Sequence, residues 1–180
     1  MASRIARAQR HPEKHQGGSI MHSAGRTILT ATLACGTLDL ASAFLFSGLR
    51  GTGPAQVLQT VASGPFGDGM LTGGISAALA GLIVHFAIMS AMTGVFVVAA
   101  GRLPFIAARP LISGIAYGFA LYLVMNWIVV PLRWPSTFPP VAPFRIANAL
   151  FSHIACVGIP MAYITARSIR RGPEEPITVA

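Results

Sequence analysis

Residues 27–49 read TILTATLACGTLDLASAFLFSGL and lie between Arg26 and Arg50. A helix crosses the hydrocarbon core of a membrane with about 20 predominantly apolar residues. This stretch meets that requirement with one charged side chain, Asp39. Three more stretches of this kind follow, separated by charged or Pro/Gly-rich breaks, at about residues 70–100, 111–130 and 144–166. The sequence therefore predicts an all-α membrane protein built as a four-transmembrane-helix bundle.

The composition of the whole chain supports this interpretation. Of the 180 residues, 53% are hydrophobic and 10% are charged, whereas soluble domains carry roughly 25% charged residues. Transmembrane barrel strands are excluded, because they alternate apolar and polar residues over about ten positions and these apolar runs are continuous and longer. The basic residues lie scattered between the apolar runs, so the net charge of +8 does not indicate a nucleic-acid partner. The expected partner is the lipid bilayer.

The basic residues also predict the orientation of the spans, because cytoplasmic loops carry an excess of Lys and Arg. With the N-terminus inside, the outer loops carry three basic residues, Arg50, Arg133 and Arg145. The inner side then carries ten: Arg4, Arg7, Arg10, Lys14, Arg26, Arg102, Arg109, Arg167, Arg170 and Arg171. We therefore expect both termini to face the cytoplasm.

This topology divides the chain into three parts. Residues 1–25 form a basic tail that we expect to be flexible and cytoplasmic, residues 26–167 form the transmembrane domain, and residues 168–180 form a cytoplasmic C-terminal tail. Met21 is an alternative start, with which the inner count falls from ten to six because four basic residues precede it. A cleaved signal peptide is disfavoured, because the first apolar run exceeds the usual 7 to 15 residues.

The first outer loop carries the pattern of a short helix. Gly53 and Pro54 are typical of an N-cap and a first helical position, and Gly64 with Pro65 predicts the end. The apolar side chains share one face and the polar ones lie largely away from it: Val57, Leu58 and Val61 against Gln56, Gln59 and Ser63. The pattern predicts a short interfacial helix that rests on the headgroups, with a lid as the alternative.

Ionisable side chains at membrane depth are candidate functional residues, because each costs free energy unless a partner satisfies it. Asp39, His85 and His153 lie at similar depth in the first, second and fourth spans, and Asn126 adds a polar group to the third. A central Asp costs about 2.5 to 3.5 kcal/mol, while each Leu, Ile or Phe returns about 0.3 to 0.6 kcal/mol. The first span is therefore marginal alone, and Asp39 is expected to face the other helices and find a donor.

The sequence leaves several roles open for this polar cluster. Asp39 could hold helix register through His85 or His153, or the Asp/His chain could carry protons. His85 and His153 could instead be axial ligands of a haem. A copper or zinc site is less supported, because no compact HxxxH or CxxC spacing is present. Hydrolytic catalysis is least supported, because the sequence contains no GxSxG, HExxH or Walker motif.

Five segments form a pattern that extends beyond hydropathy: GTLDLASAFLFSGLRG at 36–51, PAQVLQTVASG at 54–64, the glycine pair at 73 and 74, GLIVH at 81–85, and YGFALYLVMNWIVVPL at 117–132. The pattern resembles a group of uncharacterised bacterial four-helix inner-membrane proteins, and more remotely its layout is similar to YagU-like proteins of that membrane. The likeness covers about residues 29–167. It implies a multi-pass protein of the bacterial inner membrane and brings no activity, cofactor or catalytic residue.

These observations predict a class of protein and not a reaction. We expect a non-enzymatic membrane component, either a small homo-oligomer or an accessory subunit of a larger membrane complex. The first alternative is a small proton-coupled transporter or channel that uses the Asp/His cluster. The second alternative is an electron carrier that binds haem through His85 and His153.

Overall fold

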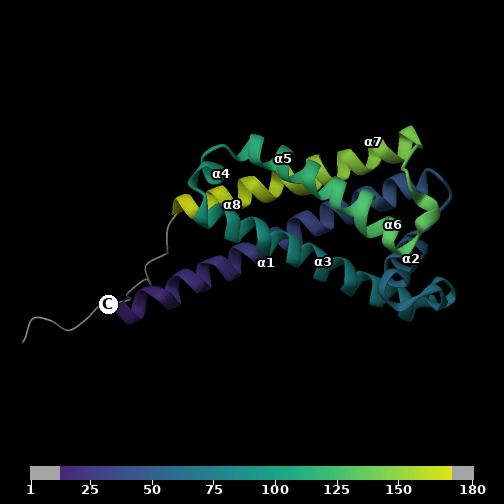
Figure 1. Ribbon diagram of the computed structural model, residues 1–180. Helices are drawn as coiled ribbons and strands as arrows, with labels where there is room; N and C mark the ends of the chain where they lie inside the picture. The colour runs from purple at the N-terminus through teal and green to yellow at the C-terminus, as the bar shows by residue number, and fades with distance from the viewer. Residues whose placement is uncertain (1–12, 172–180) are drawn as a thin grey trace, which may run out of the picture.

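The computed structural model describes the backbone of residues 13–171 and the side chains from residue 24 onward. Within this range the chain is helical and contains no strand (Figure 1). Four helical stretches are long and apolar enough to cross a membrane, at Ala24–Gly48, Gly74–Arg102, Pro110–Arg133 and Pro143–Arg171. By their length and composition, the protein is a multi-pass helical membrane protein.

Eight α-helices make up these stretches and their connections: α1 (Glu13–Gly48), α2 (Pro54–Phe66), α3 (Gly74–Arg102), α4 (Pro104–Ala108), α5 (Pro110–Leu123), α6 (Val130–Arg133), α7 (Pro143–Phe151) and α8 (Ile159–Arg171). The first span is the main part of α1, and the second is α3. The third span runs through α5 and α6, and the fourth through α7 and α8. The expected tail is helical from Glu13 onward, while residues 1–12 and 172–180 lie outside the described part.

A π-helical segment joins the two halves of the third span and of the fourth. Val124–Val129 precedes Pro131, and Ser152–Gly158 precedes Pro160. Proline has no N–H to donate and its ring crowds the carbonyl four residues earlier, and the wider π turn accommodates both defects within a continuous helix. The third span therefore continues past Pro131 to Arg133, a few residues beyond the expected end at about residue 130.

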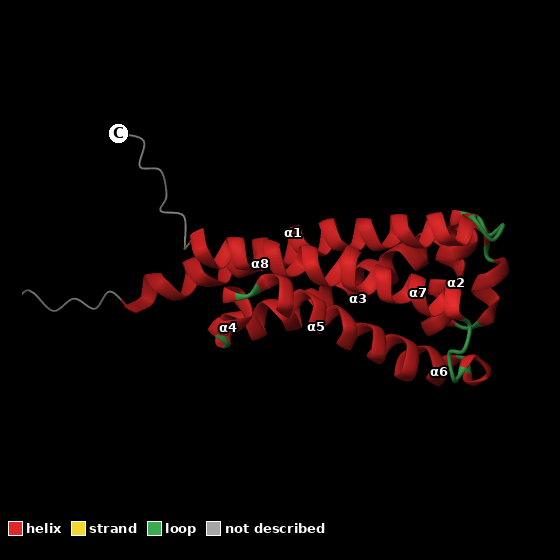
Figure 2. Cartoon of the chain, turned by 90° about the horizontal axis from the view of Figure 1, so that it is seen from above, coloured by secondary structure: helices red, strands yellow, loops and turns green. Residues whose placement is uncertain are grey.

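The long helices lie side by side along a common direction (Figures 1 and 2). The first span packs against the second and the fourth, and the third packs mainly against the fourth. Tyr117 links the third span to the second, because its hydroxyl donates to the Met92 carbonyl at 2.7 Å. The core between the spans contains small and flexible side chains, among them Ala31, Cys35, Met89, Met161 and Ala162.

Three glycines bring the third and fourth spans into backbone contact. A Cβ on Gly114 would lie 2.7 Å from the Gly158 carbonyl oxygen, and one on Gly118 would lie 2.7 Å from the Ile154 Cα. A Cβ on Gly158 would lie 2.9 Å from the Gly118 Cα. Small residues permit such close approach between membrane helices. The GxxxG pair at Gly114 and Gly118 is therefore an internal packing face.

The helix α2 forms where it was predicted, but it turns a different side inward. Gln59 and Ser63 are buried, whereas Leu58 is half-buried. Gln59 Nε2 donates to the Gly74 carbonyl at 2.9 Å, which satisfies its amide against α3. A Cβ on Gly81 would overlap the Leu58 backbone, so α2 lies directly on α3. The buried side of α2 is therefore the one with Gln59 and Ser63, and not the predicted apolar face. The Ser63 hydroxyl donates to the Thr60 carbonyl of its own helix at 2.8 Å.

The two ends of the molecule differ in structure and charge. The short helix α4, the last turns of α8 and the beginning of α1 lie at one end, while α2 and α6 lie at the other (Figure 1). Among the described side chains, the α4 end carries six arginines: Arg26, Arg102, Arg109, Arg167, Arg170 and Arg171. The α2 end carries three: Arg50, Arg133 and Arg145.

Candidate functional site

The face of α1 that carries Asp39 is turned toward the other spans. Thr32, Cys35, Gly36 and Ser42, which share this face by helical spacing, are buried. Leu33, Leu38 and Leu45 lie on the opposite face and are exposed, as expected of side chains that meet lipid. Helical spacing also predicts Leu40 on the outward face, but this side chain is buried. The marginal first span therefore directs its one carboxylate inward.

Asp39 meets side chains from two other spans. The Ser152 hydroxyl, on the fourth span, donates a short hydrogen bond to Asp39 Oδ1. His85 Nδ1, on the second span, lies 3.9 Å from Asp39 Oδ2. The Asp39 side chain is 22% exposed and that of His85 is 11% exposed. A single carboxylate thus joins the first, second and fourth spans, which agrees with the expected Asp39 to His85 contact.

The second ring nitrogen of His85 is held by the backbone of α1. His85 Nε2 lies 3.0 Å from the Gly36 carbonyl oxygen. A carbonyl only accepts hydrogen bonds, so Nε2 must carry a hydrogen to make this bond. Nδ1 is the other ring nitrogen, and it faces Asp39.

The Phe86 ring completes the wall next to this pair. It packs edge-on against the His85 ring, with ring centroids 5.3 Å apart. It also covers Gly36, where an added Cβ would lie 2.7 Å from a Phe86 ring carbon. Gly36 therefore has two roles in the site, because it supplies the carbonyl acceptor and leaves room for the ring.

His153 and Asn126, the other two predicted site residues, belong to a separate polar group. His153 Nδ1 bonds to the Ala149 carbonyl of its own helix at 2.8 Å, and its ring lies edge-on to Tyr122 at a centroid distance of 6.4 Å. Asn126 Nδ2 donates to the Tyr122 carbonyl at 3.1 Å. Both residues thus meet at Tyr122, between the third and fourth spans. Asp39 bonds to Ser152, the residue before His153, and not to His153 itself.

The connectivity of the site does not form a nucleophilic relay. Such a relay needs a hydroxyl beside a His base that the carboxylate orients. Here Ser152 donates to the Asp39 carboxylate, and the distal nitrogen of His85 is bound to a backbone carbonyl. The Ser152 hydroxyl therefore bonds to the carboxylate and not to a histidine, and the arrangement differs from a Ser-His-Asp triad.

The ring positions also do not fit a haem held between His85 and His153. An axial ligand needs a free ring nitrogen directed at the iron. Both nitrogens of His85 face protein groups, Gly36 and Asp39. Within the described residues, no group of three or more His, Cys, Asp or Glu side chains converges as a metal site. The structure therefore favours neither of the metal-based alternatives.

Two participants in the site were absent from the sequence prediction. Ser152 gave no signal of its own, because a serine costs a membrane helix little and the neighbouring His153 is the more conspicuous residue. Gly36 contributes through its backbone, which hydropathy cannot indicate. Gly36 lies three residues before Asp39, so helical spacing predicts both on one face, and this spacing is the only available signal for Gly36.

The chain was compared with protein-family models, with curated proteins and with solved structures, and no match was found. The function must therefore be argued from the residues and their geometry.

Proposed function

We propose that the protein is a non-enzymatic component of the bacterial inner membrane, a small homo-oligomer or an accessory subunit of a larger complex, with both termini in the cytoplasm. In this proposal the Asp39 network holds three spans in one register. The observation that carries it is the pairing of one carboxylate with Ser152 on the fourth span and His85 on the second. The arrangement supports a fixed scaffold, because each bond joins a different pair of helices.

Energetic considerations support a structural role for the network. A central Asp costs about 2.5 to 3.5 kcal/mol in a membrane helix, and a hydrogen bond to a charged group returns about 1.5 to 3 kcal/mol. The Ser152 bond and the His85 contact are together of the size needed to offset that cost. Losing either partner would leave a poorly solvated carboxylate, so the network favours one helix arrangement over others.

The distribution of arginine supports the proposed orientation. Six described arginines lie at the α4 end, against Arg50, Arg133 and Arg145 at the α2 end. The positive-inside rule then assigns the α4 end to the cytoplasm. On this proposal α2 lies at the outer membrane interface, where Arg133 bonds to the Ser63 carbonyl at 3.2 Å and pairs with Asp68.

The structural proposal is tested with Asp39→Asn and His85→Ala, using Thr30→Ala at an exposed position of α1 as the control. We expect both site variants to lower the yield of folded protein and to change the native mass in detergent, because the register of the spans is weakened. The control should match the wild-type protein. Unchanged yield, mass and thermal unfolding in both site variants would contradict the structural role.

A second candidate function, proton coupling in a small transporter or channel, rests on a different observation. Because His85 Nε2 is bound to Gly36, any proton gained or lost by the pair lies between Nδ1 and Asp39 Oδ2, which are 3.9 Å apart. Asp/His pairs inside membranes serve as proton relays. In this candidate function a proton passes between Nδ1 and Oδ2 while the bond from Nε2 to Gly36 stays in place.

Reconstituted protein separates the two candidates. Proton coupling predicts a proton flux in proteoliposomes that Asp39→Asn abolishes while the variant retains its native mass and thermal unfolding. A structural role predicts instead that Asp39→Asn alters assembly and that no proton flux depends on Asp39. A wild-type flux that persists undiminished in Asp39→Asn excludes this site as the proton carrier.

A further inference from the structure

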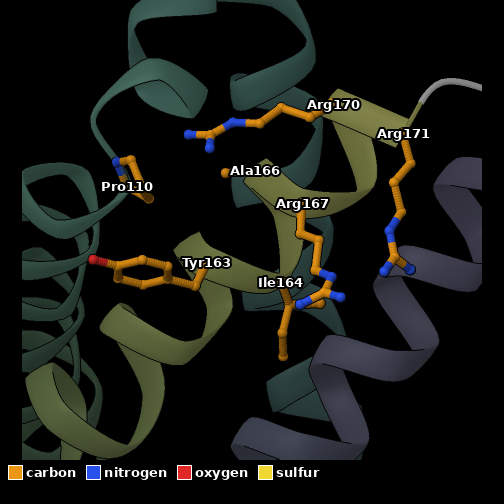
Figure 3. Close-up of a pocket in the computed structure, with 7 residues that line it drawn as sticks. All are labelled: Pro110, Tyr163, Ile164, Ala166, Arg167, Arg170 and Arg171. Carbon is orange, nitrogen blue, oxygen red and sulfur yellow. The ribbon is translucent and has the colours of Figure 1, made fainter.

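A cavity of about 500 Å³ lies at the end of α8, remote in the fold from the Asp39 network. Three arginines of α8 line it, Arg167, Arg170 and Arg171, and Pro110 at the start of α5 lies across from them. Figure 3 shows the three side chains leaving α8 in different directions, with Arg170 directed toward Pro110 and Arg171 toward the ribbon of α1. The cavity therefore lies between the end of the fourth span and the start of the third.

Among the described residues, the charged side chains that line this cavity are all arginines. Asp39 and Asp68 are the carboxylates whose side chains are described, and they pair with His85 and Arg133. Arg170 Nη2 donates to the Ala107 carbonyl at 3.4 Å, which holds this side chain against α4. Guanidinium groups carry five donors each in a planar fork, so most of the donors in the cavity remain available to an anion.

The remaining wall of the cavity is apolar and continues onto the outer surface of the span. Ile164 and Ala166 line it together with Tyr163, which is 50% exposed. Ile169, on the same helix, is 46% exposed. Large exposed apolar side chains on a span meet acyl chains, and an aromatic ring with a hydroxyl is typical of the headgroup level. The cavity thus joins a cationic part to a lipid-facing part.

We propose that this cavity binds the phosphate group of an anionic phospholipid, with its acyl chains lying along Tyr163 and Ile164. Arg167 and Arg171 bind the phosphate oxygens, since the guanidinium fork matches phosphate geometry. Arg170 keeps α8 against α4 through the Ala107 carbonyl. A soluble phosphate would use the same arginines but would gain nothing from the apolar wall, and this difference separates the two sources of phosphate.

The test is a titration of the purified full-length protein in detergent, read by native mass spectrometry and thermal unfolding. The probes are phosphatidylglycerol, phosphatidylcholine and inorganic phosphate. Arg167→Gln/Arg171→Gln is compared with Arg102→Gln/Arg109→Gln, which removes the same charge at the same end outside the cavity. Each basic residue near a membrane surface strengthens binding about fivefold, so the cavity variant should bind phosphatidylglycerol about thirtyfold more weakly and the control should bind nearly as wild type.

Three results would overturn the proposal. Equal weakening in both double variants would show general attraction of charge to the arginine-rich end. Equal stabilisation by phosphatidylcholine, which carries a phosphate but no net charge, would show that the cavity does not select an anionic phospholipid. Equal stabilisation by inorganic phosphate would assign the cavity to a soluble anion. If the Arg167→Gln/Arg171→Gln variant unfolds in the absence of lipid, Arg171→Gln alone provides the same comparison, because it removes a single charge at the end of α8.

Discussion

At the scale of single residues, Asp39 explains why the other polar groups lie where they do. Its carboxylate accepts a hydrogen bond from the Ser152 hydroxyl and faces His85. The Gly36 carbonyl accepts a hydrogen bond from His85 Nε2 and so fixes the orientation of the ring. The sequence predicted that Asp39 contacts His85 or His153, because all three are ionisable and lie at similar depth, and the structure has the His85 contact. It could not predict Ser152 over His153, because a rotation of the fourth span by one residue decides between them.

Substituting Ser152 tests the hydrogen bond directly. Ser152→Ala removes the donor and leaves Asp39 Oδ1 without its partner. We expect the free energy of unfolding in detergent to fall by about 1 to 3 kcal/mol, the range for a hydrogen bond to a charged group. Ser90→Ala, at an exposed position of α3, should change it by less than about 0.5 kcal/mol. Equal effects of the two substitutions would show that the Ser152 bond does not stabilise the fold.

At the scale of elements, the four spans follow from length and hydropathy, while their details depend on backbone contacts. The sequence predicted each span because charged residues or prolines separate the apolar runs. It placed the end of the third span near residue 130, a few residues before Arg133, since the π turn at Val124–Val129 lets the helix pass Pro131. It also misassigned the buried side of α2. Amphipathic patterning cannot indicate that a glycine of another helix, here Gly81, forms the surface against which α2 packs.

Backbone contact between the third and fourth spans predicts a large effect of one added methyl group. A Cβ on Gly118 would lie 2.7 Å from the Ile154 Cα, while one on Gly94 would meet nothing within 4 Å. Gly118→Ala should therefore destabilise the protein by about 1 to 3 kcal/mol through overpacking. Gly94→Ala should be neutral or stabilising by about 0.5 to 1 kcal/mol, because alanine is the better helix former.

Thermal unfolding of the two variants in the same detergent provides the measurement. A Gly118→Ala protein that melts at or above the wild-type temperature would show that the two helices can separate without cost. A large loss in Gly94→Ala would indicate a contact at that position and remove it as a control.

At the scale of the whole molecule, the arginines at the two ends and the polar side chains between the spans have different effects. The uneven distribution of arginine between the two ends predicts a direction across the membrane, whereas Asp39, His85 and Ser152 connect helices within the fold. The direction remains a prediction from the sequence. The lateral neighbours of each span were not predictable, because many helix arrangements bury one carboxylate and only the glycine faces select among them.

The orientation predicts which ends react with a reagent that cannot cross the membrane. In a Cys35→Ala/Cys156→Ala background, Ser136→Cys lies at the α2 end and Ala108→Cys at the α4 end. An impermeant maleimide should label Ser136→Cys in spheroplasts and Ala108→Cys only after lysis. The opposite pattern would invert the topology.

The coupling between Asp39 and Ser152 tests the central claim that one carboxylate ties the spans together. A double-mutant cycle compares the unfolding free energies of Asp39→Ala, Ser152→Ala and the combined variant. A matched cycle pairs Asp39→Ala with Thr93→Ala, because Thr93 is buried and bonds to the Met89 carbonyl of its own helix. We predict a coupling free energy of at least about 1 kcal/mol for the first pair and additivity within about 0.5 kcal/mol for the second. Additivity in both cycles would contradict the account.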